Sequence, residues 1–221
     1  MPQGFIDALA QGFTGNDVGG FAVAPGVVTE NLDLLGEGRV KVRVSAMPGF
    51  EPWARMALIG AGGGRGFCWI PQIDDEVLVA FAQNDSSAAY VLGGLWSTVD
   101  RPPVIVPTDF LTKRTLKTGF AGGVGHQVEF DDLLQSVTIT TSTQQKITLD
   151  PEKIELSGAF GALTISLNNA TQTISLQAAV KLELKAPQIS LEGLTVEIKG
   201  TEVSINAAGP CSVQGLPIKL N

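Results

Sequence analysis

The chain has 221 residues, 44% of them hydrophobic, and its 15 Lys and Arg against 22 Asp and Glu give a net charge of −7. At about 100–200 residues per domain, this length allows one or two domains. Nucleic-acid binding needs clustered basic residues that displace counterions from phosphates, so no nucleic-acid partner is expected for this sparsely charged acidic chain. A single His also limits catalysis that depends on imidazole.

The two cysteines, Cys68 and Cys211, fit neither a CxxC pair nor a zinc-ligand spacing. We therefore expect buried or shielded thiols, no metal site and no cofactor. The first residues lack a basic segment followed by an apolar one, and no run approaches the roughly 18 apolar residues that span a bilayer. Assembly in the cytoplasm without a signal peptide is expected.

Residues 1–35 are expected to form an N-terminal arm. Four apolar residues in it fall at roughly helical spacing, but neighbouring glycines keep any helix short. Two interpretations remain open, a loosely ordered terminus or an arm that docks on a partner. The docking residues would be Phe5, Ile6, Leu9 and Phe13.

Residues 36–107 are predicted to form a small closed β-barrel. Residues 39–44 alternate strictly, so Val40, Val42 and Val44 share one face. Denser apolar runs suit buried strands, and turn residues separate them. The five predicted strands span residues 39–44, 56–59, 66–70, 76–81 and 90–93.

Residues 137–221 differ in kind from the rest of the chain. They contain one aromatic residue, Phe160, and their six Lys against seven Asp and Glu give −1, which leaves −6 for residues 1–136. Short alternating apolar segments recur every seven to eleven residues, which predicts a repeat array with one strand per repeat. These segments are 137–139, 147–149, 154–156, 163–167, 174–176, 180–184, 189–191, 194–198, 203–205 and 216–220.

Each of these strands can bury only two or three aliphatic side chains. That area does not offset about 1–2 kcal/mol of backbone entropy per residue, and a single chain leaves strand edges unpaired. Both problems are removed if identical chains wind around a common axis. Three-fold closure is the simplest ring for two-faced strands, so the sequence predicts a homotrimer joined to the barrel through a collar at residues 108–136.

The ordered motifs across about residues 36–221 resemble the contractile-tail spike family. Its members are the baseplate assembly protein V of tailed phages and the valine-glycine repeat spikes of type VI secretion and extracellular contractile injection systems. The matching motifs lie at residues 38–44, 53–55, 61–67, 75–81, 90–96 and 125–132, with Pro71 and Asp85.

This resemblance implies an all-β protein with an oligonucleotide/oligosaccharide-binding-type (OB) barrel followed by an intertwined trimeric triple-stranded β-helix needle. It implies a non-enzymatic structural protein, the central spike of a phage tail or injection particle. The barrel would attach to the hub, and the needle would transiently pierce the target cell envelope when the sheath contracts. The chain has no room for hub domains, so a separate hub protein is expected. Phage tail, tailocin, extracellular injection system and type VI apparatus all remain open.

The C-terminal end resembles the blunt tips that receive a separate conical cap of the proline-alanine-alanine-arginine (PAAR) repeat type. An ending β-helix leaves open backbone groups and an exposed aliphatic plug, which invite a cap. The alternative is that the last residues fold over and seal the end. The expected docking residues are Leu216, Pro217, Ile218 and Leu220.

Three other functions are alternatives to the spike. The glycine cluster at residues 60–66 lacks the Gly-Lys-Ser/Thr ending of a phosphate-binding loop. His126 with Glu129, Asp131 and Asp132 could form an acid/base group, but a solvated collar is the preferred interpretation. The third, a trimeric tailspike-like protein that binds or degrades polysaccharide, needs aromatic platforms for sugars, which residues 137–221 lack.

Overall fold

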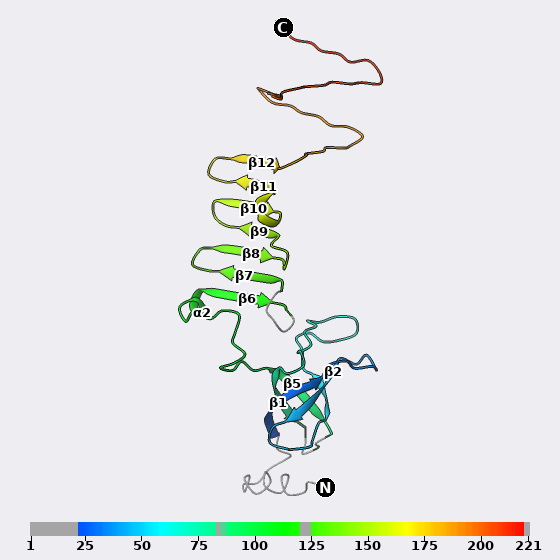
Figure 1. Ribbon diagram of the computed structural model, residues 1–221, viewed down its shortest axis with the longest axis vertical. Helices are drawn as coiled ribbons and strands as arrows, with labels where there is room; N and C mark the ends of the chain where they lie inside the picture. The colour runs from blue at the N-terminus through cyan, green and yellow to red at the C-terminus, as the bar shows by residue number, and fades with distance from the viewer. Residues whose placement is uncertain (1–21, 83–84, 86, 120–124, 219–221) are drawn as a thin grey trace. The chain divides into compact units, whose positions relative to one another are not determined.

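A computed structural model describes residues 22–82, 85, 87–119 and 125–218 (Figure 1). The chain divides into two units, Met1–Ala179 and Val180–Asn221. The first unit contains a barrel and a separate sheet, with the four-residue helix α2 (Asp109–Thr112) before the sheet. In the described part of the chain, no helix has the length and apolar character needed to cross a membrane.

Five strands close the barrel in the order β1-β2-β3-β5-β4. All neighbours are antiparallel except β3 and β5, which run parallel. This arrangement confirms the predicted all-β class and the small closed barrel. The strands are β1 (Ala22–Glu30), β2 (Arg39–Val44), β3 (Trp53–Met56), β4 (Glu76–Phe81) and β5 (Ala89–Gly94).

Small β-branched side chains fill the barrel core. Val40, Val42 and Val44 are fully buried, as the alternation of β2 predicted. Because β-branched residues are stiff and pack well on a pleated strand, this core needs few large side chains. The remaining core residues are Ala24, Val28, Ala54, Val77, Val79, Phe81, Ala89 and Val91.

The fifth barrel strand is not the one expected from the sequence. β1 lies within residues 1–35 and pairs with both β2 and β4, so it belongs to the barrel. The strand expected at residues 66–70 is not formed, and β3 ends at Met56. Positive φ angles at Gly60, Gly64 and Gly66 turn the chain repeatedly in this region and prevent a continuous ladder.

The sheet of the first unit is a seven-stranded meander in which every strand pairs with its sequence neighbour. β6 and β7 lie within residues 108–136, so the ladder begins inside the expected collar. β8 to β12 confirm the strands predicted between residues 137 and 176. The strands are β6 (Lys113–Lys117), β7 (Gln127–Asp131), β8 (Ser136–Thr140), β9 (Lys146–Leu149), β10 (Lys153–Ser157), β11 (Leu163–Asn168) and β12 (Thr173–Ala178), with the 3-10 turn η1 (Ala159–Gly161) after β10.

The second unit, described to residue 218, contains no strand, although its alternating segments predicted several.

The expectation of buried or shielded thiols is wrong for this chain, because Cys68 and Cys211 are both exposed. Cys68 lies in the glycine-rich stretch without a ladder, and Cys211 lies in the strand-free unit. Neither of these two segments forms a packed layer that would cover a thiol.

A close approach of β1 and β2 makes Gly26 sensitive to substitution. A Cβ atom there would lie 2.5 Å from Cγ1 of the buried Val42 and 3.1 Å from the Arg43 carbonyl oxygen. We expect Gly26→Ala to lower the free energy of unfolding by about 1–3 kcal/mol, measured by urea denaturation. Gly63→Ala is the control, because nothing lies within 4 Å of its Cβ position. Equal losses in both variants would contradict the overpacking argument.

An ion pair fixes the turn between β1 and β2. The Asp33 carboxylate accepts hydrogen bonds from Arg39 Nε and Nη2 at 3.1 and 3.0 Å, and from the backbone N–H groups of Leu35, Glu37 and Arg39. These contacts, above all the Arg39 side-chain hydrogen bonds, hold the pKa of Asp33 well below its ordinary value. The carboxylate is therefore ionised in the folded barrel over the whole neutral and mildly acidic range.

The lowered pKa of Asp33 makes the contribution of this turn to stability depend on pH. Since the folded-state pKa lies below the unfolded one, the stabilisation is fully present above the unfolded value of about 4 and is lost as pH falls through the folded value. Asp33→Asn should therefore destabilise the protein at pH 6 and lose part of that effect at pH 3. Urea unfolding at both pH values measures the difference, and a constant difference would contradict this role.

Candidate functional site

The seven-stranded sheet has two chemically different faces. Directly paired residues of neighbouring strands point to the same side of a sheet, so the register defines continuous rows. Two of these rows consist of aliphatic or aromatic side chains from β7 to β12, and we call them together the apolar face. One row is Phe130, Val137, Leu149, Ile154, Leu167 and Ile174, and the other is Val128, Ile139, Ile147, Leu156, Ile165 and Leu176.

Nothing in the described single chain covers the apolar face. Ten of its twelve side chains are exposed large hydrophobic groups, from 36% for Ile147 to 72% for Ile174. Contiguous apolar surfaces of this kind are rare on monomers and mark interaction sites. The face is therefore the strongest candidate for a binding surface on the sheet.

The opposite face of the sheet is polar. One of its rows runs through Thr138, Thr148, Glu155, Ser166 and Ser175. The Lys153 ammonium lies 2.7 Å from Glu155 Oε2, and that hydrogen bond raises the pKa of Lys153. Hydroxyl and paired charged groups of this kind suit a solvated surface.

The four residues that the sequence suggested for acid/base chemistry form hydrogen bonds within strands and turns. The Glu129 carboxylate accepts a hydrogen bond from Gln127 Nε2 at 3.0 Å, and His126 Nδ1 accepts one from the backbone N–H of Ser142 at 3.3 Å. Asp131 is 6% exposed and accepts the N–H groups of Leu133 and Leu134 at 3.0 Å each. The backbone N–H of Asp132 donates to the Thr112 carbonyl at 2.8 Å. These hydrogen bonds lie within a strand or turn or join it to its neighbour, so the contacts stabilise the local structure.

The two docking regions expected from the sequence lie at the ends of the chain. Leu216 is fully exposed and Ile218 is 51% exposed, and both belong to the second unit with Pro217. Leu220 and the four hub-side residues are outside the described residues. The hub-side residues are Phe5, Ile6, Leu9 and Phe13.

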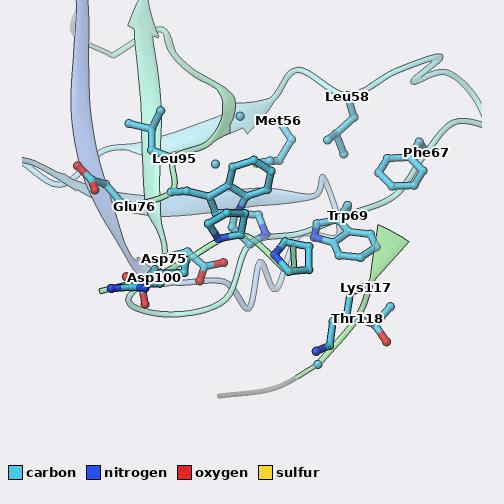
Figure 2. Close-up of a pocket in the computed structure, with 18 of the residues that line it drawn as sticks. Met56, Leu58, Phe67, Trp69, Asp75, Glu76, Leu95, Asp100, Lys117 and Thr118 are labelled. Atoms are coloured by element: carbon cyan, nitrogen blue, oxygen red, sulfur yellow. The ribbon is translucent and has the colours of Figure 1, made fainter. Parts of the chain in front are cut away.

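A groove lies where β3 and β5 end and β4 begins, and Figure 2 shows the side chains that line it. Its volume is about 870 Å³. Trp69 stacks on Phe67 with ring centroids 5.6 Å apart and an interplanar angle of 11°. Trp96 is 70% exposed, and the hydrogen bond of 2.8 Å from Leu95 N–H to the Glu76 carbonyl ties its segment to β4. We call this the aromatic groove.

Carboxylates line the aromatic groove together with the aromatic rings. Asp75, Glu76 and Asp100 are among its lining residues, with Arg101 and Lys117. In the part of the chain that the structure describes, none of the three carboxylates forms an ion pair. Asp75 accepts the Gln72 N–H at 2.7 Å and so fixes the turn that begins β4.

Sequence reasoning missed the aromatic groove. Trp69 and Trp96, which line the groove, lie outside the strands and are partly exposed. Trp69 lies two residues before Pro71 and Trp96 two residues after Gly94, and these turn-forming neighbours could have indicated surface sites. The described residues hold no group of three His, Cys, Asp or Glu side chains placed to bind a metal ion.

Comparison with known proteins agrees with this architecture. Residues 24–96, which run from β1 to just beyond β5, match the family described as the type VI secretion system/phage-baseplate injector OB domain. The chain is also 27% identical over 159 residues to the actin cross-linking toxin VgrG1 of Vibrio cholerae serotype O1. That alignment covers 71% of this chain and 14% of the toxin, so the chain spans a small part of that relative. The two similarities confirm the recognition of the contractile-tail spike family.

Proposed function

We propose that this chain is a non-enzymatic, trimeric central spike of a contractile tail or injection machine. The observation that carries the proposal is the uncovered apolar face of the sheet. Three copies that turn these faces toward a common axis would bury both apolar rows against each other and keep the polar faces in water. At roughly 25 cal/mol per Å² of apolar surface, this burial supplies a driving force that the single chain lacks.

The second unit supports the same assembly. Its apolar and polar residues alternate as they do in β8 to β12, but residues 180–218 form no strand in the single chain. Backbone N–H and C=O groups that find no partner in their own chain need one elsewhere. We propose that these segments pair between chains and form the intertwined triple-stranded β-helix of the needle.

The remaining parts of the proposal rest on the family. Injector OB domains belong to phage baseplates and type VI secretion systems, so we assign the barrel to attachment on a separate hub or tube protein. The needle would then pierce the target cell envelope on sheath contraction, with a PAAR-type protein as its cap. The particle would be a phage virion tail or a contractile injection particle, assembled in the cytoplasm.

The alternative is a tailspike-like protein that binds or degrades polysaccharide. One observation favours the binding part of this alternative, namely the aromatic groove of the barrel. The groove is formed by the barrel segments and the end of β6 and leaves the apolar face free, so the two functions do not exclude each other.

Trimer formation can be tested by placing a charge on either side of one strand. Ile147 belongs to the apolar face, and its neighbour Thr148 belongs to the polar face. Ile147→Asp should abolish the trimer, because three carboxylates would be buried without partners, whereas Thr148→Asp should leave it intact. Light scattering should give three times 23.1 kDa for the wild type and for Thr148→Asp. A stable folded monomer of the wild type in dilute solution would refute the proposal.

Cap docking is tested separately at the C-terminal end. We expect Leu216→Asp with Ile218→Asp to abolish binding of a purified PAAR-type cap protein from the same gene neighbourhood, while the trimer mass is unchanged. Thr201→Asp, farther from the end of the same unit, is the control for an added charge. Unchanged cap binding by the double variant would show that the end seals itself.

A further inference from the structure

The aromatic groove presents flat apolar surfaces. Trp69 stacks on Phe67 with nearly parallel ring planes, both rings are partly exposed, and Trp96 supplies a further, more exposed ring. Aromatic rings that remain partly exposed on a small barrel offer a large apolar contact area at little loss of conformational entropy. An aromatic surface of this kind suits a ligand that itself has flat apolar faces.

The groove also offers acceptors that are not committed to cations. Glu76 and Asp100 form no ion pair with any described residue, and both line the groove. A carboxylate accepts O–H and N–H hydrogen bonds, and hydrogen bonds to charged groups are among the stronger ones. The groove therefore combines apolar surfaces with acceptors, and its volume of about 870 Å³ lies in the usual range for small-ligand sites.

These features discriminate between classes of ligand. A lipid tail or an apolar protein surface would bury the carboxylates without partners, which is costly. A polyanion is disfavoured, because the three carboxylates Asp75, Glu76 and Asp100 outnumber the two cations Arg101 and Lys117 in the lining. A neutral saccharide satisfies both requirements, because its ring faces are apolar and its rim carries hydroxyl and, where N-acetylated, amide donors.

We propose that the aromatic groove binds a neutral oligosaccharide, with Trp69 and Trp96 stacking on sugar rings and with Glu76 and Asp100 accepting hydrogen bonds from their hydroxyl or amide groups. OB-type barrels are known to accommodate oligosaccharides, so the fold is compatible with this role. The tryptophans and carboxylates of the site belong to the barrel segments, and the end of β6 completes its lining, so the site does not depend on residues 180–218 and goes beyond the proposed spike function. A barrel with this site would contact a glycan as well as its protein neighbours.

The test is titration of the full chain with chitotetraose and with cellotetraose, by calorimetry and by tryptophan fluorescence. We expect saturable binding of at least one of them, and a loss of at least ten-fold in affinity for both Trp69→Ala and Trp96→Ala. Trp53→Phe is the control, because Trp53 does not line the groove. Its ring lies on β3 beneath the Arg39 guanidinium, whose Cζ is 5.7 Å from the ring centroid. A tetragalacturonate should bind at least ten-fold more weakly than the neutral sugars.

Several outcomes would overturn the proposal. These are no binding of either neutral sugar below about 10 mM, unchanged affinity in both Trp69→Ala and Trp96→Ala, or an equal loss in Trp53→Phe. Circular dichroism checks that each variant is folded, and Trp96→Ala decides the test if Trp69→Ala unfolds, because the Trp96 side chain is 70% exposed. The trimer mass, measured in the same samples, separates a failure of the sugar site from a failure of the spike proposal.

Discussion

The dominant physical constraint on this protein is an apolar sheet face that its own chain does not cover. The twelve side chains of the two apolar rows are in register over six strands, so any surface that buries one of them buries its neighbours. The barrel has the opposite character. Its core valines are fully buried within one chain, and its strands close on themselves without a free edge. One chain therefore combines a barrel that buries its own core with a sheet whose apolar face stays exposed.

This contrast explains why the two parts use different residues. A closed barrel needs stiff side chains that fill a small interior, and valine meets that need in β2, β4 and β5. A sheet that is buried only on one side needs leucine and isoleucine on that side and hydroxyl groups on the other. On the polar face, Lys153 and Glu155 form a close ion pair at the solvated surface.

Much of the backbone could be predicted from alternation alone. The pattern at residues 39–44 and the segments between residues 137 and 176 correspond to strands, because period-two alternation is the direct signature of a half-buried strand. β1 was missed because Pro25 and Gly26 interrupt it, and both residues normally argue against a strand interior. The aromatic groove could not be predicted, since it joins residues from four separate segments, 56–58, 67–76, 93–105 and 117–119, that only the folded chain brings together. The exposed cysteines were missed because neither the glycine-rich loop around Cys68 nor the strand-free segment around Cys211 gives a burial signal.

The connectivity of the meander has a consequence for how the molecule is made. Every strand from β6 to β12 pairs only with its sequence neighbours, so each hairpin can close as soon as its second strand leaves the ribosome. Residues 180–218 form no such local hairpin, and in the proposed trimer they would pair only after the other chains are present. Maturation would then proceed directionally, from early hairpins to a late distal end, and incomplete translation products would stop short of the step that locks the strands together.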